Sequence, residues 1–161
     1  MTPTFPVRRG PRPATSLGMP HQQLDQQPTD SAPREALARR VFALPGVVEE
    51  RSGVSVPGAR ALVLEPGAAA GPESSFMVGR EFAHLHPAPD QSLHLVLPRD
   101  VATAAIGAGW AEPHPLAARM QGPSIAVMVF APRNDDEVDV IAGLIETSHR
   151  YATGTEPHPA G

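Results

Sequence analysis

The sequence predicts an α+β domain built on a single mostly antiparallel sheet with helices packed on one face. Short segments rich in aliphatic and β-branched residues follow one another, with brief turns containing Gly and Pro between them. This spacing favours antiparallel pairing of neighbouring strands. Helical patterns stand at both ends of the series and once within it, so the expected order is α-β-β-β-β-β-α-β-α.

The first helix is expected to follow residue 29. Asp30 or Ser31 can cap it, and apolar residues then recur at helical spacing until Pro45. Short β-type segments bounded by Gly and Pro come next. They are expected to form strands over 47–51, 60–65, 75–78, 82–86 and 92–97.

The second half of the domain contains two more helices and one strand. Pro98 suits the first position of a short helix, and GWAEPHPL after it is expected to form a loop. SIAVMVF, residues 124–130, has the composition of a buried strand. The last helix has the strongest signals, because Asn134 can cap it and Glu137 follows three residues later, as in a capping box.

Composition changes at both ends of this region. Residues 1–29 are rich in Pro, Gln and Arg and lack periodicity, and residues 153–161 are also polar. Both segments are therefore expected to be disordered tails around one domain over residues 30–152. His21 and His158 fall in these tails and are not expected to contribute to a site.

Residue types missing from the chain exclude several chemistries. Without lysine there can be no lysine Schiff base, and without cysteine there can be no thiol catalysis, disulfide or thiolate metal site. A metal would need His, Asp or Glu ligands. The net charge of −4 disfavours a nucleic-acid partner, and no apolar run is long enough to span a membrane. We therefore expect a cytoplasmic protein that binds a small molecule, with no membrane or nucleic-acid partner.

The stretch REFAHLHPAPDQSLHLVLP, residues 80–98, contains three of the seven histidines. A hairpin closed symmetrically around its Pro-rich loop pairs Leu85 with Leu93 and His84 with His94. A register shift of one residue would place histidines opposite leucines, so the alternation selects this pairing. The sequence therefore predicts one apolar and one polar face for this hairpin.

The same register assigns further residues to the polar face. His86 is expected opposite Ser92, and Phe82 opposite Val96, so that Phe82 and Ser92 become candidate substrate-binding residues. Arg80 precedes the first strand and is a candidate for binding an anionic substrate, although a surface position explains it equally simply.

The residues alone leave three interpretations of the histidine face open. It can be a solvated sheet surface, or a pocket in which a histidine acts as general base or hydrogen-bond donor. It can also be a metal site, since H-x-H on a strand occurs in mononuclear centres. We expect no cofactor; the alternative is a single metal ion bound by His84, His86 and His94, or by two of them with a carboxylate.

The stretch GWAEPHPLA adds three candidates. If it is extended, Trp110, Glu112 and His114 share one side. Trp110 can line a site for an aromatic ligand or cap the core, and the core is the preferred interpretation. Glu112 and His114 can form a carboxylate–imidazole pair that tunes a catalytic base, while the neighbouring prolines suit a plain rigid loop equally well.

Four stretches between residues 34 and 152 together resemble the luciferase-domain family: ALPGVVEERSG, VGREFAHLHPAPDQSLHLVLP, AIGAGWAEPHPLA and VMVFAPRNDDEVDVIAGLIETSHRYA. This family comprises small actinobacterial and other bacterial proteins together with the fungal luciferases, and is unrelated to the flavin-dependent bacterial luciferase. The fungal luciferase oxygenates a hydroxypyrone, 3-hydroxyhispidin, with molecular oxygen and light emission, without flavin or nicotinamide. The resemblance therefore implies an oxidoreductase with monooxygenase-like chemistry. The positions that it implies for the site are His84, His86, His94, Glu112 and His114.

The expected function is oxidation of a small enolic or hydroxy-aromatic substrate by oxygen, after a histidine has removed an acidic hydroxyl proton. A non-catalytic module that binds a small ligand or a protein on the same face is the alternative. The element order also resembles the YjbR-like α+β fold, for which a DNA-binding module would be expected, but the net charge of −4 disfavours it.

Overall fold

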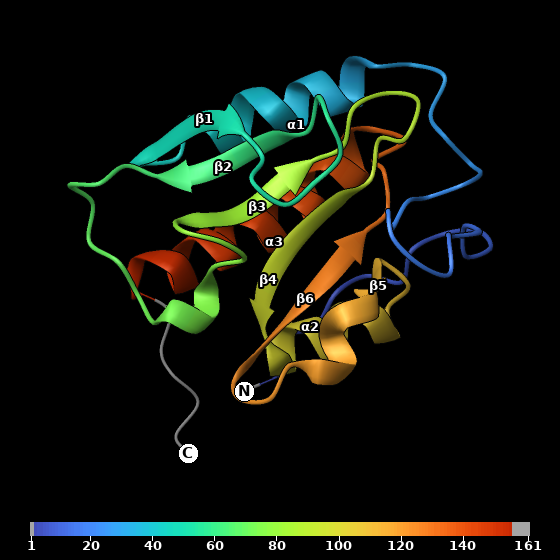
Figure 1. The fold of residues 1–161 in the computed structure, drawn as a ribbon. Helices are drawn as coiled ribbons and strands as arrows, with labels where there is room; N and C mark the ends of the chain where they lie inside the picture. The colour runs from blue at the N-terminus through green and yellow to red at the C-terminus, as the bar shows by residue number, and fades with distance from the viewer. Residues whose placement is uncertain (1, 156–161) are drawn as a thin grey trace.

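One antiparallel sheet of six strands forms the centre of the molecule in the computed structural model, which describes residues 2–155. The strand order across the sheet is β1-β2-β3-β4-β6-β5 (Figure 1). The strands are β1 (Val47–Arg51), β2 (Arg60–Leu64), β3 (Glu81–Leu85), β4 (Leu93–Pro98), β5 (Ala111–Pro113) and β6 (Ser124–Val129). The α-helices are α1 (Ala32–Phe42), α2 (Arg99–Gly107) and α3 (Asp135–Thr153).

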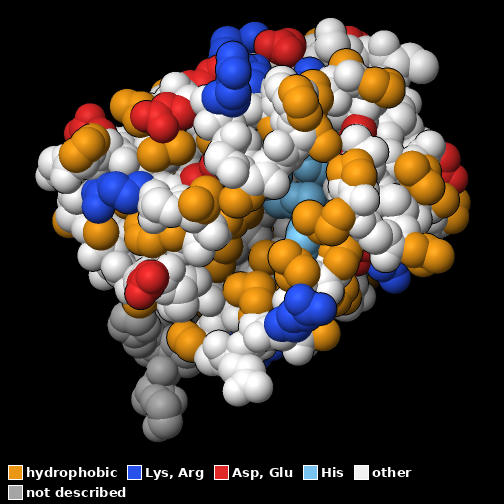
Figure 2. All heavy atoms as spheres, viewed as in Figure 1, with side chains coloured by type: hydrophobic (Ala, Val, Ile, Leu, Met, Phe, Trp, Pro, Cys, Tyr) orange, Lys and Arg blue, Asp and Glu red, His pale blue; other side chains and the backbone are white. Residues whose placement is uncertain are grey.

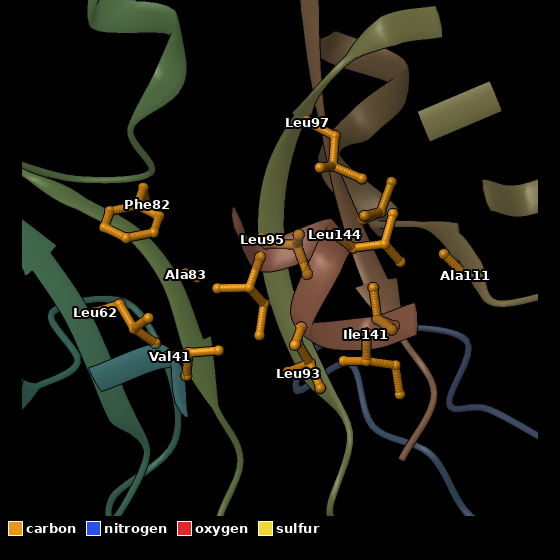
Figure 3. Close-up of a cluster of buried hydrophobic side chains, with 14 of the residues drawn as sticks. Val41, Leu62, Phe82, Ala83, Leu93, Leu95, Leu97, Ala111, Ile141 and Leu144 are labelled. Carbon is orange, nitrogen blue, oxygen red and sulfur yellow. The ribbon is translucent and has the colours of Figure 1, made fainter. Parts of the chain in front are cut away.

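The hydrophobic core lies between the sheet and the helices. Aliphatic residues from every second position of the central strands meet the buried faces of α1, α2 and α3, and Figure 3 shows part of this cluster. Burying one such side chain fully is worth about 1.5–3 kcal/mol, so this face is the main source of stability. The predicted α+β class, with helices on one face of an antiparallel sheet, is confirmed.

Local signals place the last helix where the sequence predicts it. The side chain of Asn134 accepts a hydrogen bond from the Glu137 N–H at 3.0 Å. The Glu137 carboxylate in turn accepts from the Arg133 N–H at 2.9 Å, which completes a reciprocal cap one residue earlier than usual. At the other end, Gly154 adopts φ +78°, the left-handed conformation that ends a helix without strain for glycine.

The predicted register of the histidine hairpin is confirmed. Leu85 pairs with Leu93 and His84 with His94 across β3 and β4. The leucines face the helices and belong to the core, so the histidines face the opposite side of the sheet.

A β-bulge changes the assignment at the start of β3. The pairing of β2 with β3 shifts by one residue, so that Phe82 has no partner on β2. Phe82 therefore turns into the core (Figure 3). Its ring centroid lies 5.9 Å from that of His149 on α3. The expectation that Phe82 lies opposite Val96 on the histidine face is wrong, and the side chain of Glu81 lies there instead, in contact with His84.

Two expected elements are also corrected. Residues 75–78 do not form a strand; a short 3-10 helix (Glu73–Ser75) ends there, and a single bridge joins Val78 to Glu81 in a tight turn. Conversely, Ala111–Pro113 pairs with β6 instead of forming a loop. Because β5 is an edge strand, Pro113 can end it without removing a donor from the sheet interior. A second 3-10 helix (Pro115–Arg119) follows.

The N-terminal segment packs along the domain. Residues 2–29 contain no helix and only one bridge, Thr15 with Gln23, as their composition suggests. Arg8, His21 and Gln23 are nevertheless buried, so a free tail does not describe residues 2–29 of this structure.

At the C-terminus, α3 and its cap occupy residues 153 and 154. Most of the tail expected over 153–161, with His158, lies outside the described residues. Among the helices that the structure describes, none is long and apolar enough to cross a bilayer.

Candidate functional site

A cavity of about 810 Å³ opens on the sheet face opposite the helices. This volume lies within the range typical of small-molecule sites. Figure 2 shows histidine side chains at the base of a hollow that is surrounded by hydrophobic side chains. The cavity is therefore apolar at its walls and carries imidazoles at its base. The histidines that line it are His21, His84, His86, His94 and His114.

Cross-strand pairing positions the central part of this site. On the open face, directly paired residues form a row across four strands, His84 on β3, His94 on β4, Met128 on β6 and Glu112 on β5. Paired side chains on one sheet face approach closely, so strands distant in sequence bring these groups together.

His94 is the centre of the histidine cluster. Its side chain is only 6% exposed. The other four ring centroids surround its own, at 4.5 Å (His86), 4.8 Å (His114), 5.0 Å (His84) and 5.3 Å (His21). A proton on any one of these rings would therefore repel protons on the others.

Buried carboxylates support three of the five rings from outside the cluster. The nitrogen–oxygen contacts are His84 Nδ1 to Glu81 at 2.8 Å, His86 Nδ1 to Asp90 at 2.7 Å and His21 Nε2 to Glu112 at 2.5 Å. Burial has the largest single influence on these carboxyl groups and raises their pKa. The hydrogen bonds that they accept outweigh burial, and the net shift of each pKa is downward. Each ionised carboxylate thus holds a proton on the ring nitrogen that faces it.

Glu81, His84 and His94 form a hydrogen-bonded chain that fixes the tautomer of His94. Because His84 donates its Nδ1–H to Glu81, its Nε2 in the neutral ring carries a lone pair. His94 Nδ1 lies 3.1 Å from His84 Nε2 and must therefore donate the proton of this hydrogen bond. The second nitrogen of His94, Nε2, therefore carries a lone pair and no proton. It is buried and has no hydrogen-bond partner among the described residues.

The electrostatics of the cluster favour the neutral form of three of its rings, those of His84, His94 and His114. Burial, followed by the neighbouring imidazoles, lowers the pKa of His94 well below its usual value. Burial also lowers the pKa of His84 despite the opposing hydrogen bond to Glu81, and it lowers the pKa of His114 to about 4. His114 Nδ1 accepts a hydrogen bond from the Leu116 N–H at 3.1 Å, so the proton of its neutral ring is on Nε2. The cavity thus contains both acceptor and donor imidazoles.

Two overlapping groups of histidines are close enough to hold a metal ion. His84, His86 and His94 form one group, and His21, His94 and His114 form the other; within each, the ring nitrogens lie within 4.8 Å of one another. Neutral imidazoles supported by carboxylates are the usual setting of metal-binding histidines, and nitrogen donors suit zinc, copper or iron. In this structure, His84 Nε2 is used in the hydrogen bond to His94.

Several candidates from the sequence lie outside the cavity lining. Arg80 donates to the backbone carbonyls of Leu64, Glu65 and Ala68 at 2.8–3.1 Å, and so fastens a loop instead of facing a ligand. Trp110 belongs to the core, and its Nε1–H donates to the Pro6 carbonyl at 2.6 Å, which confirms the core interpretation.

Ser92 lies beside the histidines and supports one of them. Its hydroxyl donates to Asp90 at 2.7 Å and lies 3.0 Å from His86 Nδ1, so Ser92 helps to orient this carboxylate–imidazole pair. It is fully buried and is not among the residues that line the cavity.

The carboxylate–imidazole pair expected between Glu112 and His114 is formed with a different histidine. Glu112 contacts His21 and also the guanidinium of Arg12, both from the N-terminal segment. No pattern in the sequence points to His21, because its position depends entirely on how residues 2–29 pack. Asp90 was accessible to sequence reasoning, since it lies in the hairpin loop four residues after His86.

Comparison with known proteins gives a consistent result. Residues 79–148 match the family model described as Luciferase domain. The chain is 30% identical over 175 residues to "Luciferase" from Armillaria ostoyae and to "Luciferase" from Armillaria gallica, an alignment that covers 99% of this chain and 64% of each relative. It is 37% identical to "Luciferase" from Neonothopanus nambi over 84 residues, 51% of this chain and 30% of that relative. The chain thus spans less than two thirds of the Armillaria relatives, 64% of their length. No solved structure matches it significantly.

Proposed function

Because this chain belongs to the luciferase-domain family, we propose that it catalyses the oxidation of a small enolic or hydroxy-aromatic substrate by molecular oxygen, without an organic cofactor. The observation that carries the proposal is the unpartnered nitrogen of His94, a buried lone pair at the base of the cavity. Buried polar atoms without a partner are rare in native proteins and are common where a ligand binds.

The cavity supports a neutral substrate with an acidic hydroxyl group. Its walls are mainly apolar, with Val56, Phe76 and Val96 among them, which suits a flat hydrophobic body. No arginine is among the described residues that line it, so no fixed cation is available to bind a substrate that is already ionised. The substrate therefore enters as the neutral molecule, and its hydroxyl proton is removed inside the cavity.

His94 is the base in the proposed first step. Its Nε2 takes the hydroxyl proton, and the resulting imidazolium donates its Nδ1–H to His84. His84 in turn donates to the Glu81 carboxylate, whose negative charge offsets the positive charge on the two rings. Of the buried carboxylates beside the cluster, Glu81 is the one joined to His94 through the His84 hydrogen bonds, so its loss would remove the charge that compensates a proton on His94 along this chain.

Oxygen reacts with the substrate anion in the second step. The anion passes one electron to oxygen, and the substrate radical and superoxide combine to form a carbon–oxygen bond. The peroxide anion then takes back the proton from His94 Nε2, so that substrate and oxygen give a hydroperoxide with all atoms and electrons balanced. The Nε2–H of His114 lines the same cavity and can stabilise the negative oxygen as it forms.

Oxygen uptake tests this proposal directly. A panel of hydroxypyrones and catechols is supplied to the wild-type chain, to His94→Gln and to His149→Gln. His149 lies on α3 on the other side of the sheet and is the matched control. We expect uptake by the wild type and the control, and a loss of about 10²–10⁴-fold in His94→Gln, the usual contribution of a general base. Full activity of His94→Gln would exclude this base. Ligand-dependent thermal stabilisation without any oxygen uptake would support a binding module instead.

A further inference from the structure

We propose that His21 is a second catalytic residue of this cavity and that residues 11–29 form the strap that brings it there. In the proposed reaction, which this inference deepens, His21 Nδ1 accepts a hydrogen bond from the substrate while His94 removes its proton. Neither the composition of the segment nor the family match assigns this role, since the matched residues begin at position 79.

His21 is packed as closely into the site as the hairpin histidines. The residue is 4% exposed. Its ring stacks on that of His94, with centroids 5.3 Å apart and an interplanar angle of 19°, and meets the His114 ring edge-on at 5.4 Å. The strap therefore completes the wall of the cavity with a functional group.

The protonation of His21 follows from its neighbour. Glu112 accepts hydrogen bonds from both His21 Nε2–H and Arg12, and these contacts hold it in the ionised form. In the neutral His21 ring the proton is therefore on Nε2, and Nδ1 carries a lone pair.

His21 Nδ1 is buried and has no partner among the described residues, like His94 Nε2. The two stacked rings thus present two unsatisfied acceptors at the same cavity, and a substrate that donates to both would satisfy them. A substrate held in this way is fixed in orientation against the base, which accelerates the reaction in the manner of other positioned catalytic groups.

The strap is attached by polar contacts. Gln23 accepts from the Ala131 N–H at 2.9 Å, and Gln91 donates its side-chain amide to the Pro28 carbonyl at 2.9 Å. The larger apolar residues of the strap, Leu17, Met19 and Leu24, are 102%, 60% and 60% exposed and add no core packing. Such a segment can open without unfolding the domain, and this gives the substrate a route to His94.

Chemical modification tests, without any substrate, whether the strap covers His94. The full chain is treated with diethyl pyrocarbonate, and carbethoxylation of each histidine is followed by peptide mass spectrometry. We expect His94 to react slowly in the wild type and at least about tenfold faster in His21→Ala and Glu112→Gln, since loosening the strap uncovers a buried ring. Gln22→Ala, a change in the adjacent residue, is the matched control and should leave the rate unchanged. Circular dichroism checks that each variant is folded.

Kinetics test the catalytic role. For a substrate that the wild type oxidises, His21→Gln should lower kcat/KM at least about tenfold, while Gln22→Ala should retain it. Wild-type His94 that reacts as fast as free histidine, or an unchanged kcat/KM in His21→Gln when His94→Gln is inactive, would overturn the inference and leave the proposed oxidation standing. Because the modification rates need no turnover, they show whether the strap covers His94 even if the oxidation itself is not observed.

Discussion

Replacing Glu81 by Gln should exchange donor and acceptor in both hydrogen bonds that link residue 81, His84 and His94. Glu81 is 3% exposed and accepts from the Gly53 N–H at 2.9 Å, from the Ser52 hydroxyl at 2.7 Å and from His84 at 2.8 Å. A backbone N–H cannot become an acceptor, so the amide oxygen of Gln must accept the hydrogen bond from the Gly53 N–H. The amide NH₂ then faces His84 Nδ1, which has to carry the lone pair.

This inversion removes the proposed base. His84 would carry its proton on Nε2 and donate it to His94 Nδ1, which leaves His94 with its own proton on Nε2. An acceptor at the base of the cavity becomes a donor. We expect kcat to fall by about 10²–10⁴-fold, the range for loss of a general base, and serine proteases lose about 10⁴-fold when the carboxylate that orients their histidine is made an amide.

The effect on stability should be smaller and separable. Hydrogen bonds to a charged group are worth about 1.5–3 kcal/mol each, and Gln can keep the bond from Gly53, so a loss of about 2–4 kcal/mol in the free energy of unfolding is expected. Glu49→Gln is the matched control. Its exposed ion pair with Arg60 on the neighbouring strand should be worth at most about 1 kcal/mol and should not affect the cavity.

Two measurements decide this prediction. Oxygen uptake at saturating substrate gives kcat for the wild type, Glu81→Gln and Glu49→Gln. Nitrogen-15 NMR of the histidine rings reports which nitrogen of His94 is protonated. A kcat of Glu81→Gln within twofold of the wild-type value, or an unprotonated His94 Nε2 in this variant, would refute the proton chain.

Three further predictions follow from the same geometry. Phe82→Ala should cost about 3–5 kcal/mol in urea unfolding, because Phe82 packs in the core; a cost below about 1 kcal/mol would contradict the bulge assignment. The pKa values of His84, His94 and His114 lie below the ordinary 6.5, so the unfolded chain binds these protons first. Stability should therefore fall as the pH drops from 6.5 towards about 4, the pKa of His114, by up to about 1.4 kcal/mol per pH unit for each histidine, and His94→Asn should reduce the slope. Untagged protein should contain no stoichiometric iron, copper or zinc by elemental analysis and should keep its oxygen uptake after chelation; a bound metal that is lost in His84→Ala would replace the metal-free mechanism.

Alternation of residue types predicted the part of the site that depends on neighbouring strands. A single register keeps the leucines of the hairpin on one face and its histidines on the other, so the pairing of His84 with His94 followed from hydrophobic burial alone. The same argument failed at Phe82, because a bulge adds a residue without changing the local pattern. Whether a bulge forms depends on the pairing with β2, which the sequence of β3 does not contain.

His21 shows a different limit of sequence reasoning. The segment around it has neither periodicity nor apolar residues that need burial, and such composition is typical of disorder. It is held by hydrogen bonds to groups that the domain presents only after folding, such as Glu112 on the edge strand and the Ala131 N–H beyond β6. Local patterns cannot reveal an order that depends on such partners.

The two faces of the sheet explain why the cavity needs this segment. The α-helices that the structure describes all pack on the leucine face, so none of them covers the histidines on the other side. Five imidazoles facing open water would gain little from being together, and water would satisfy His94 Nε2. Burying them keeps that nitrogen without a partner until a ligand arrives, and the N-terminal segment contributes to that burial on the open side. The polar contacts that attach it are therefore consistent with its function, since a cover fixed by core packing would also exclude the substrate.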